Sequence, residues 1–255
     1  AAGAGRLEVL QWGKRQGFRF SKWSCADAAA GGHLDVLRWL RGEECGCEWG
    51  EETTWMAAMN GHLAVVQWAR ANGCQWSEQA SWCAAANGHL HVLQYLRANN
   101  CPWDAWTPII SAENGHMNVL NWAILNGAPV DVQVCQMAAR RGDLRMLRWA
   151  RDHGCPWSEL TMAAAAENGH LDVLIWLRRH GCPVDEYAAA NAASHGHLEV
   201  LQWVVANGFP WDKECCSRAR KWAKRGGDRR LLAWIHANNS PCGHRPGHEE
   251  ESGEL

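Results

Sequence analysis

Apolar and polar positions along this chain follow a helical period, and the whole pattern restarts about every 27 residues. Within the block 155–181, apolar side chains recur at the three- and four-residue spacing that places them on one helix face; they are Leu171, Val173, Leu174, Trp176 and Leu177. The alanine-rich stretch 159–167 precedes them and predicts another helix, with Asn168-Gly169 between the two. Each block therefore predicts one pair of helices.

Near copies of the segment Asn168 to Trp176 occur nine times. The residues aligned with His170 are Arg6, His33, His62, His89, His116, Asp143, His170, His197 and Asp228. Six of the eight steps between them are 27 residues, and the others are 29 and 31. A fixed period in this range is typical of a solenoid, in which each repeat contacts only its neighbours. We expect an all-α solenoid of about nine stacked helix-turn-helix repeats over residues 1–242, followed by a disordered acidic tail over 243–255.

The segment Asn-Gly-His-Leu-(Asp/Glu)-Val-Leu after an Ala-Ala pair resembles the helix-turn-helix of the ankyrin family. Thr107-Pro108-Ile109-Ile110 is similar to the Thr-Pro-Leu-His start of an ankyrin unit. Ankyrin units run about 33 residues, and here the shortfall lies between the second helix and the next first helix. We therefore expect short, hairpin-less, ankyrin-like units. The resemblance implies protein–protein recognition.

Composition and net charge bear on the class of partner and on the cellular compartment. The formal charge of −2 gives no overall indication of a nucleic-acid or membrane partner, and no apolar run is long enough to span a membrane. Five of the twelve cysteines share one register, where stacked repeats would hold them too far apart for a disulfide. They are Cys47, Cys74, Cys101, Cys155 and Cys182. We expect free thiols and a reducing intracellular compartment, with cytoplasm, nucleus and organelle interior left open. Ala1 to Gly5 resembles the end of a first helix, so we expect further sequence upstream.

The recurring histidines predict no metal site, because equivalent side chains one repeat apart are too separated to share an ion. A structural role at the helix start is the preferred interpretation. The chain has no phosphate-binding glycine loop and no nucleophile in a recognisable motif. We expect neither a catalytic residue nor a cofactor, and no small-molecule substrate.

Eighteen tryptophans are the compositional anomaly. Most share two registers and predict core or loop packing. Five break register: Trp23, Trp55, Trp82, Trp106 and Trp222. Four of these, with Met59 and Ile109, fall 10, 7 or 3 positions before the aligned His, which is one stripe along the first helices. The stripe Trp23, Trp55, Met59, Trp82, Trp106 and Ile109 either binds a partner on the concave surface or fills the contacts between repeats.

A basic residue recurs at the end of the second helix, where it suits the helix dipole. Repeat five carries Ile124-Leu125 there instead. An apolar pair at a register that is normally charged indicates a covered spot, either by a partner or by a neighbouring side chain.

We therefore predict a non-catalytic protein-interaction scaffold, or a bracing subunit of a large complex, whose partners are other proteins. The candidate partner-binding residues are Trp23, Trp55, Met59, Trp82, Trp106, Ile109, Ile124 and Leu125. The alternative is binding of nucleic acid or another polyanion through the basic sixth and last repeats, where arginines and lysines cluster. It is less favoured because few aromatic residues lie between those arginines.

Overall fold

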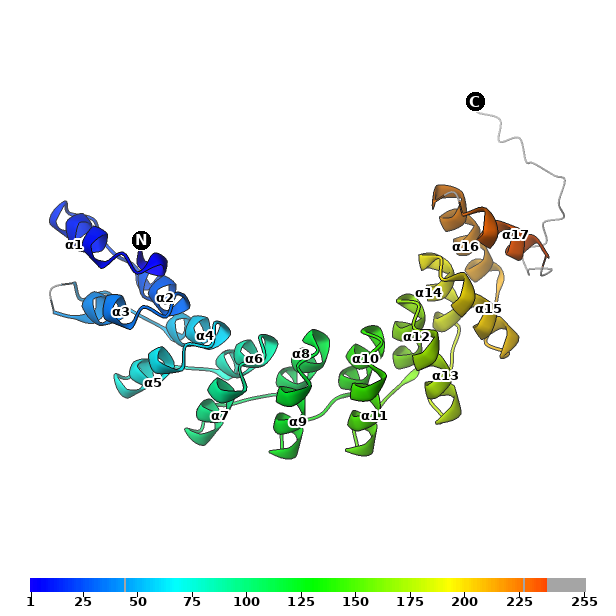
Figure 1. Cartoon of the computed structure of the whole chain (residues 1–255), viewed down its shortest axis with the longest axis horizontal. Coiled ribbons are helices and arrows are strands. Elements are labelled where there is room, and N and C mark those ends of the chain that lie inside the picture. Colours follow the sequence, from blue (N-terminus) through cyan, green and yellow to red (C-terminus); the bar gives the residue numbers. More distant parts are fainter. Residues whose placement is uncertain (44, 227, 238–255) are drawn as a thin grey trace, which may run out of the picture. The chain divides into compact units, whose positions relative to one another are not determined.

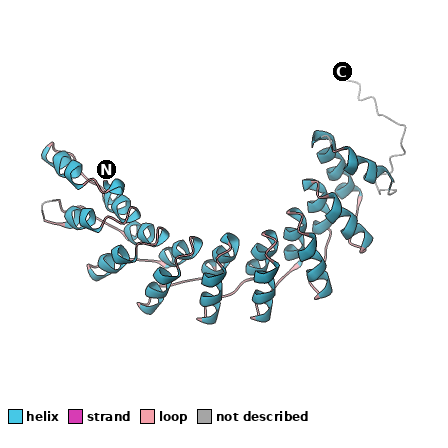
Figure 2. Cartoon of the chain, viewed as in Figure 1, coloured by secondary structure: helices cyan, strands magenta, loops and turns pink. Residues whose placement is uncertain are grey.

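The computed structural model describes residues 1–43, 45–226 and 228–237. These residues form seventeen α-helices and one short 3-10 helix, and this part of the chain contains no strand (Figure 2). The predicted all-α fold of stacked helix pairs is confirmed. The tail predicted over 243–255 lies outside the described residues and stays a prediction.

The chain divides into two units, Ala1–Asp131 and Val132–Leu255 (Figure 1). In unit 1 the helices are η1 (Ala2–Ala4), α1 (Leu7–Arg15), α2 (Lys22–Ala30), α3 (Leu34–Arg41), α4 (Glu51–Met59), α5 (Leu63–Ala71), α6 (Glu78–Ala86), α7 (Leu90–Ala98), α8 (Trp106–Asn114) and α9 (Met117–Leu125).

In unit 2 the helices are α10 (Val132–Arg140), α11 (Leu144–Asp152), α12 (Glu159–Glu167), α13 (Leu171–Arg179), α14 (Tyr187–His195), α15 (Leu198–Ala206), α16 (Lys213–Gly226) and α17 (Arg229–Ala237). In every pair we call the even-numbered helix the first helix and the odd-numbered one the second helix; η1 takes the place of the first helix before α1.

Adjacent first helices within a unit are packed far more closely than adjacent second helices. Paired alanines make this possible because they carry no bulk. Ala57, Ala58, Ala84 and Ala85 of α4 and α6 are fully buried. In unit 1, close packing on one side places α2, α4, α6 and α8 on the inner side of the stack and fans out α3, α5, α7 and α9 (Figure 1).

The recurring Gly-His dipeptide forms a joint between neighbouring repeats. The glycine has positive φ, as at Gly88 (φ +75°), and ends the first helix in the left-handed conformation. The histidine of the next repeat lies against it, so that a Cβ on Gly88 would come within 2.8 Å of the His116 ring. His116 Nε2 also donates to the carbonyl of Ala86, at 3.0 Å. The histidine is structural, and it stabilises the stack between repeats.

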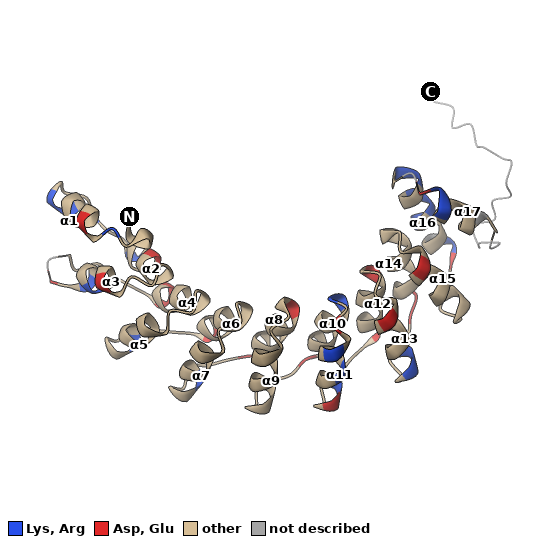
Figure 3. Ribbon diagram, viewed as in Figure 1, with Lys and Arg blue, Asp and Glu red and all other residues tan. Residues whose placement is uncertain are grey.

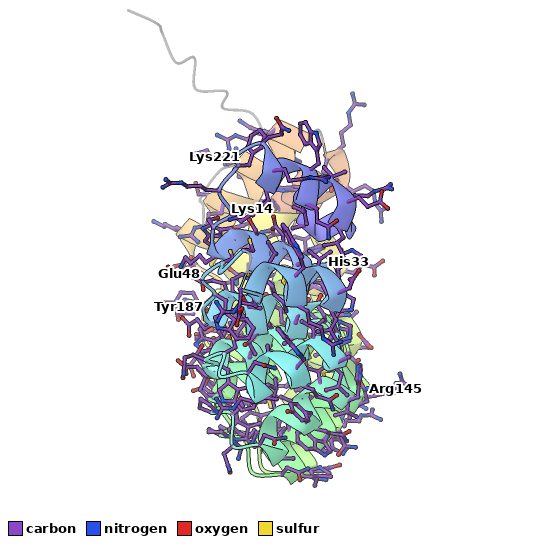
Figure 4. All side chains as sticks on the ribbon, turned by 90° about the vertical axis from the view of Figure 1, so that its left-hand side faces the viewer. Lys14, His33, Glu48, Arg145, Tyr187 and Lys221 are labelled. Carbon is purple, nitrogen blue, oxygen red and sulfur yellow. The ribbon has the colours of Figure 1, made fainter. Side chains whose placement is uncertain are left out.

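The same joint recurs in both units. His62 lies on Gly32 in unit 1, and His170 and His197 lie on Gly142 and Gly169 in unit 2. Where the aligned residue is Asp143, its carboxylate accepts from Met146 N of its own helix instead. Figure 4 labels His33 and Glu48 on opposite sides of unit 1, because the Gly-His turns and the loops lie at opposite ends of each helix pair.

The loops between repeats are held by an arginine and a tryptophan. Arg97, at the end of α7, donates to the Cys101 carbonyl at 2.7 Å and lies 4.2 Å from the centre of the Trp103 ring. Trp103 in turn meets Trp122 of α9 edge to face, with ring centroids 5.9 Å apart. Arg151, Trp157 and Trp176 repeat this arrangement in unit 2. The basic residues that recur at the ends of the second helices are therefore not only solvated charges, because Arg97 and Arg151 hold the loops that follow them.

Among the residues that the structure describes, ten cysteines are free: Cys25, Cys45, Cys47, Cys74, Cys83, Cys101, Cys135, Cys155, Cys182 and Cys215. Nine of these are buried, and burial raises the pKa of Cys101 to about 11 and of Cys135 to about 12. Cys216 is disulfide-bonded, so the expectation that every cysteine is free was wrong at this residue.

Candidate protein-binding surface

The first helices of unit 1 carry an unusual row of large apolar side chains at their surface. Trp23 of α2 is 50% exposed, Trp106 of α8 is 53% exposed and Met59 of α4 is 42% exposed. Trp55 of α4 and Trp82 of α6 are half-buried. Because α2, α4, α6 and α8 are consecutive in the stack, these side chains come from neighbouring helices of one layer. We call Trp23, Trp55, Met59, Trp82 and Trp106 the aromatic face.

Ile109 does not belong to this face. Only 3% of its side chain is exposed, and it lies among the buried residues of α8 with Thr107 and Ser111. At the same position before the aligned His, Trp55 and Trp82 keep part of their rings exposed because an indole is too large to be enclosed there. The shorter isoleucine fits the core, so its assignment as a partner-binding residue was wrong.

Trp222 of α16, the fifth tryptophan that breaks register, forms a joint. A Cβ on Gly196 would meet the Trp222 ring, at the place that a histidine occupies in the other joints. The aligned residue, Asp228, accepts from Arg230 N and Leu231 N of α17, each at 3.0 Å. The longer last repeat therefore uses an indole in place of the imidazole.

Ile124 and Leu125 lie on α9, a second helix, and so in the other layer from the aromatic face. Ile124 is half-buried and Leu125 is 64% exposed. Ile124 stands where Arg97 stands one repeat earlier, and the loop that follows carries Val130 in the register of Trp103. Arginine and its tryptophan are thus replaced together, which explains Ile124 without a partner. Leu125 has no such explanation and stays a separate candidate.

Sequence analysis did not single out two exposed side chains of unit 2. Leu160 of α12 is 43% exposed and Tyr187 of α14 is 50% exposed (Figure 4). Both stand ten positions before the aligned His, which is the position of Trp23 and Trp106 in unit 1. Comparing that one position across the eight repeats that contain it would have found them.

Charge differs between the two units (Figure 3). Unit 1 has nine Lys and Arg against twelve Asp and Glu, a formal charge of −3, whereas residues 132–237 have fifteen against eleven, a formal charge of +4. Much of the excess lies on α16, whose Lys221, Lys224 and Arg225 are exposed. In repeat six, Arg148 and Arg151 lie over Trp176 and Trp157. Two of its five arginines therefore already contact tryptophans, and the proposal of polyanion binding depends mainly on α16.

Neither a metal centre nor an activated thiol emerges from the described residues. Within them, no group of three His, Cys, Asp or Glu side chains has the arrangement to hold a metal ion. The groove beside α2 is lined by Lys14, Arg19, Phe20, Cys45 and Cys47, among others. Burial raises the pKa of the Cys47 thiol, which disfavours the nucleophilic thiolate. No helix in the described ranges has the length and apolar character that a membrane crossing requires.

Comparisons with known proteins agree with the helix pairs. Residues 54–134 match the family model of ankyrin repeats in three copies. A crystal structure of the human ASB11 ankyrin repeat domain superposes with a TM-score of 0.57 and 17% sequence identity, covering 71% of this chain and 96% of that one. No curated protein sequence matches this chain.

The family match begins within α4, ends at the start of α10 and includes four of the five residues of the aromatic face, all except Trp23. The fold of the larger part of the chain agrees with the solved ankyrin domain. The Gly-His joints, the paired alanines and the 27-residue period extend the same unit beyond the matched residues. The ankyrin resemblance seen in the sequence is therefore confirmed for residues 54–134, and the helix pairs on either side of them share the fold of an ankyrin repeat domain.

Proposed function

We propose that this protein is a non-catalytic interaction scaffold that binds another protein through the aromatic face of unit 1. Ankyrin repeats, which residues 54–134 match, are typically protein-interaction modules. The observation that supports the specific face is the exposure of Trp23, Met59 and Trp106 on three of the four first helices α2, α4, α6 and α8. Large exposed aromatics are costly in water and are the residues that dominate binding energy in protein interfaces.

Physical chemistry also supports a non-catalytic role. Catalysis needs an acid, base or nucleophile with a pKa matched to its task. Burial instead raises the pKa of the thiols, to about 12 at Cys182, and leaves them in the unreactive form. Binding, by contrast, needs only a rigid and shaped surface, and a stack of short helices supplies one.

The exposed tryptophans allow a matched test. The double variant Trp23→Ala/Trp106→Ala removes half-exposed indoles from the aromatic face, and Trp12→Ala removes an indole that is 54% exposed on α1, a second helix. Quantitative pull-downs from cells that express the protein compare both variants with the wild type. We expect partners that the double variant loses at least about tenfold and that Trp12→Ala retains. Equal recovery with all three proteins would contradict the assignment of this face.

The cysteines support a reducing intracellular compartment as the site of action. Free thiols predominate among the described cysteines, and Cys216 is the exception. Denatured but unreduced protein should therefore label with a thiol reagent at ten or more of its twelve cysteines. Labelling at half of them or fewer would indicate an oxidising compartment instead.

A further inference from the structure

Two carboxylates lie beside two indoles of the aromatic face. Glu51 and Trp55 are four residues apart on α4, and Glu78 and Trp82 are four residues apart on α6. Side chains at this spacing are neighbours on one helix face. Both carboxylates are exposed and both indoles are half-buried. Each pair presents a negative group next to the electron-rich face of an aromatic ring, and both features attract a cation.

The surrounding helices leave these carboxylates without enough positive charge. The first helices α2, α4, α6 and α8 carry one basic residue, Lys22, and five acidic ones, Asp27, Glu51, Glu52, Glu78 and Glu113. Lys22 forms an ion pair with Glu52. Neither Glu51 nor Glu78 has an ion-pair partner within the described part of the chain. The layer therefore combines exposed aromatic rings with excess negative charge.

Lys22 shows how a cation is held on this layer. Its ammonium lies 5.4 Å from the centre of the Trp23 ring and bonds to the Glu52 carboxylate of the next first helix. The protein thus already holds one lysine between an indole and a carboxylate. Trp55 with Glu51, and Trp82 with Glu78, offer the same two groups without a lysine of the chain to occupy them.

We propose that the partner segment on the aromatic face is basic, and that its lysine or arginine side chains lie between Trp55 and Glu51 and between Trp82 and Glu78. This rests on the proposed function, which assigns the aromatic face to a protein partner, and adds the chemistry of that partner. Ring and carboxylate act on the same cation, since the guanidinium or ammonium lies over the indole while it donates to the carboxylate. Apolar side chains of the segment cover Trp23, Met59 and Trp106.

Helix dipoles alone do not account for the arrangement. Acidic residues in a first turn stabilise any helix, and Glu159 in α12 stands in the same register as Glu51 and Glu78. Four residues after Glu159 comes Ala163, which is buried. The carboxylate recurs in both units, but the indole beside it occurs only in unit 1. Glu159 is therefore a matched control for the two proposed sites.

The test starts from peptides selected on the full chain. A displayed library of random 16-residue peptides is panned against the wild-type protein, and the enriched peptides are tested again on Trp23→Ala/Trp106→Ala. We expect peptides that need the aromatic face and carry a net positive charge, with two or more Lys or Arg. Affinity of one such synthetic peptide, followed by tryptophan fluorescence, should fall roughly tenfold in Glu51→Gln/Glu78→Gln and change less than about twofold in Glu159→Gln. It should also weaken with added salt.

The outcomes separate the two proposals. Peptides that need the aromatic face but are neutral or acidic, or that bind Glu51→Gln/Glu78→Gln as tightly as the wild type, would overturn the basic partner and leave the proposed function standing. Peptides that bind Trp23→Ala/Trp106→Ala unchanged, or no enrichment at all, would count against both. Since Glu51 and Glu78 are exposed, their amide variants are expected to fold, which circular dichroism confirms before binding is measured.

Discussion

Units 1 and 2 are built on the same joints but present different first helices to solvent. In both, an imidazole lies on the glycine of the preceding repeat, as His116 does on Gly88 and His197 on Gly169. In both, an arginine closes the loop over a tryptophan. At the positions of Trp55 and Trp82, however, unit 2 has the buried alanines Ala163 and Ala190. In addition, α16 of unit 2 is basic, whereas the first helices of unit 1 are acidic overall.

This contrast separates what the fold requires from what it leaves open. Most positions that join repeats carry the same residue in both units because each repeat must fit a neighbour of similar geometry. Positions on the solvent-facing side of the first helices do not pack against another repeat, so they are free to differ. Differences between the units on that side are the ones to explain by function. The predictions below test this distinction between joint positions and solvent-facing positions.

Substitutions at the joint glycines should have the largest effect, and an equal one in both units. Gly88→Ala and Gly169→Ala force a Cβ into an imidazole at positive φ, and we expect a loss of about 2–5 kcal/mol. Gly73→Ala and Gly181→Ala also have positive φ but meet nothing within 4 Å, so they should lose about 1–2 kcal/mol. Native-state hydrogen exchange measures each unit separately. Equal losses at joint and loop glycines would show that the imidazole contributes nothing.

The second largest loss of stability is expected at the joint between Trp222 and Gly196 in unit 2. Trp222→Ala removes the ring that lies on Gly196, and we expect a loss of about 2–3 kcal/mol, measured by the protection of α14 to α17. Trp23→Ala in unit 1 removes a half-exposed ring and should cost about 0.5 kcal/mol or less. A larger loss at Trp23 than at Trp222 would reverse the roles assigned to the two residues.

Loop closure by arginine should contribute less, and alike in both units. Arg97→Ala and Arg151→Ala each remove a charged donor to a cysteine carbonyl and the packing on a tryptophan, so we expect a loss of about 1–2 kcal/mol in urea unfolding. Arg145→Ala, an exposed arginine on α11, serves as the control and should change stability by less than about 0.5 kcal/mol. If Arg97→Ala and Arg151→Ala lost no more stability than Arg145→Ala, the basic residues at the ends of the second helices would be ordinary solvated side chains.

The smallest effect expected is a pH dependence in unit 1. Burial lowers the pKa of His89 below its usual 6.5, with His91, His116 and His62 adding repulsion and a hydrogen bond to the Met59 carbonyl opposing the shift. Below pH 6.5 the unfolded chain binds a proton more readily than the folded one, so stability falls as the pH drops from about 6.5 through the folded pKa. The loss should stay under about 1 kcal/mol because solvent screens the ring.

NMR titration of the histidines, together with urea unfolding at pH 7 and pH 5, measures this dependence. His89→Gln is the variant that should flatten it. A pKa for His89 at or above 6.5, or an unchanged slope in the variant, would contradict the argument.

The repeat could be predicted from sequence because it is local. Apolar spacing, the Gly-His turn and the paired alanines specify a helix pair within one block, and nine copies make the pattern unmistakable. Which surface tryptophans are exposed could not be predicted, since exposure depends on how neighbouring helices close around a side chain. Ile109 and Trp55 share a register, yet one is buried and the other half-buried.

The residue pairs that meet at the joints between repeats could not be predicted from the sequence either. His116 meets Gly88, and Trp222 meets Gly196, across separations that a single repeat does not contain. The disulfide state of Cys216 also depends on spatial proximity that register alone does not give. Register predicts which residues are equivalent, whereas contact requires the stack itself.

The Gly-His joint has a consequence for how such an array changes in length. A block such as 62–88 contains one glycine that receives an imidazole and one histidine that supplies it, so its two faces are complementary to each other. Duplication of a whole block therefore adds a complete joint and disturbs none of those already present. Insertion of a partial block would leave a glycine without its ring, so ankyrin arrays of this kind are expected to lengthen by whole units.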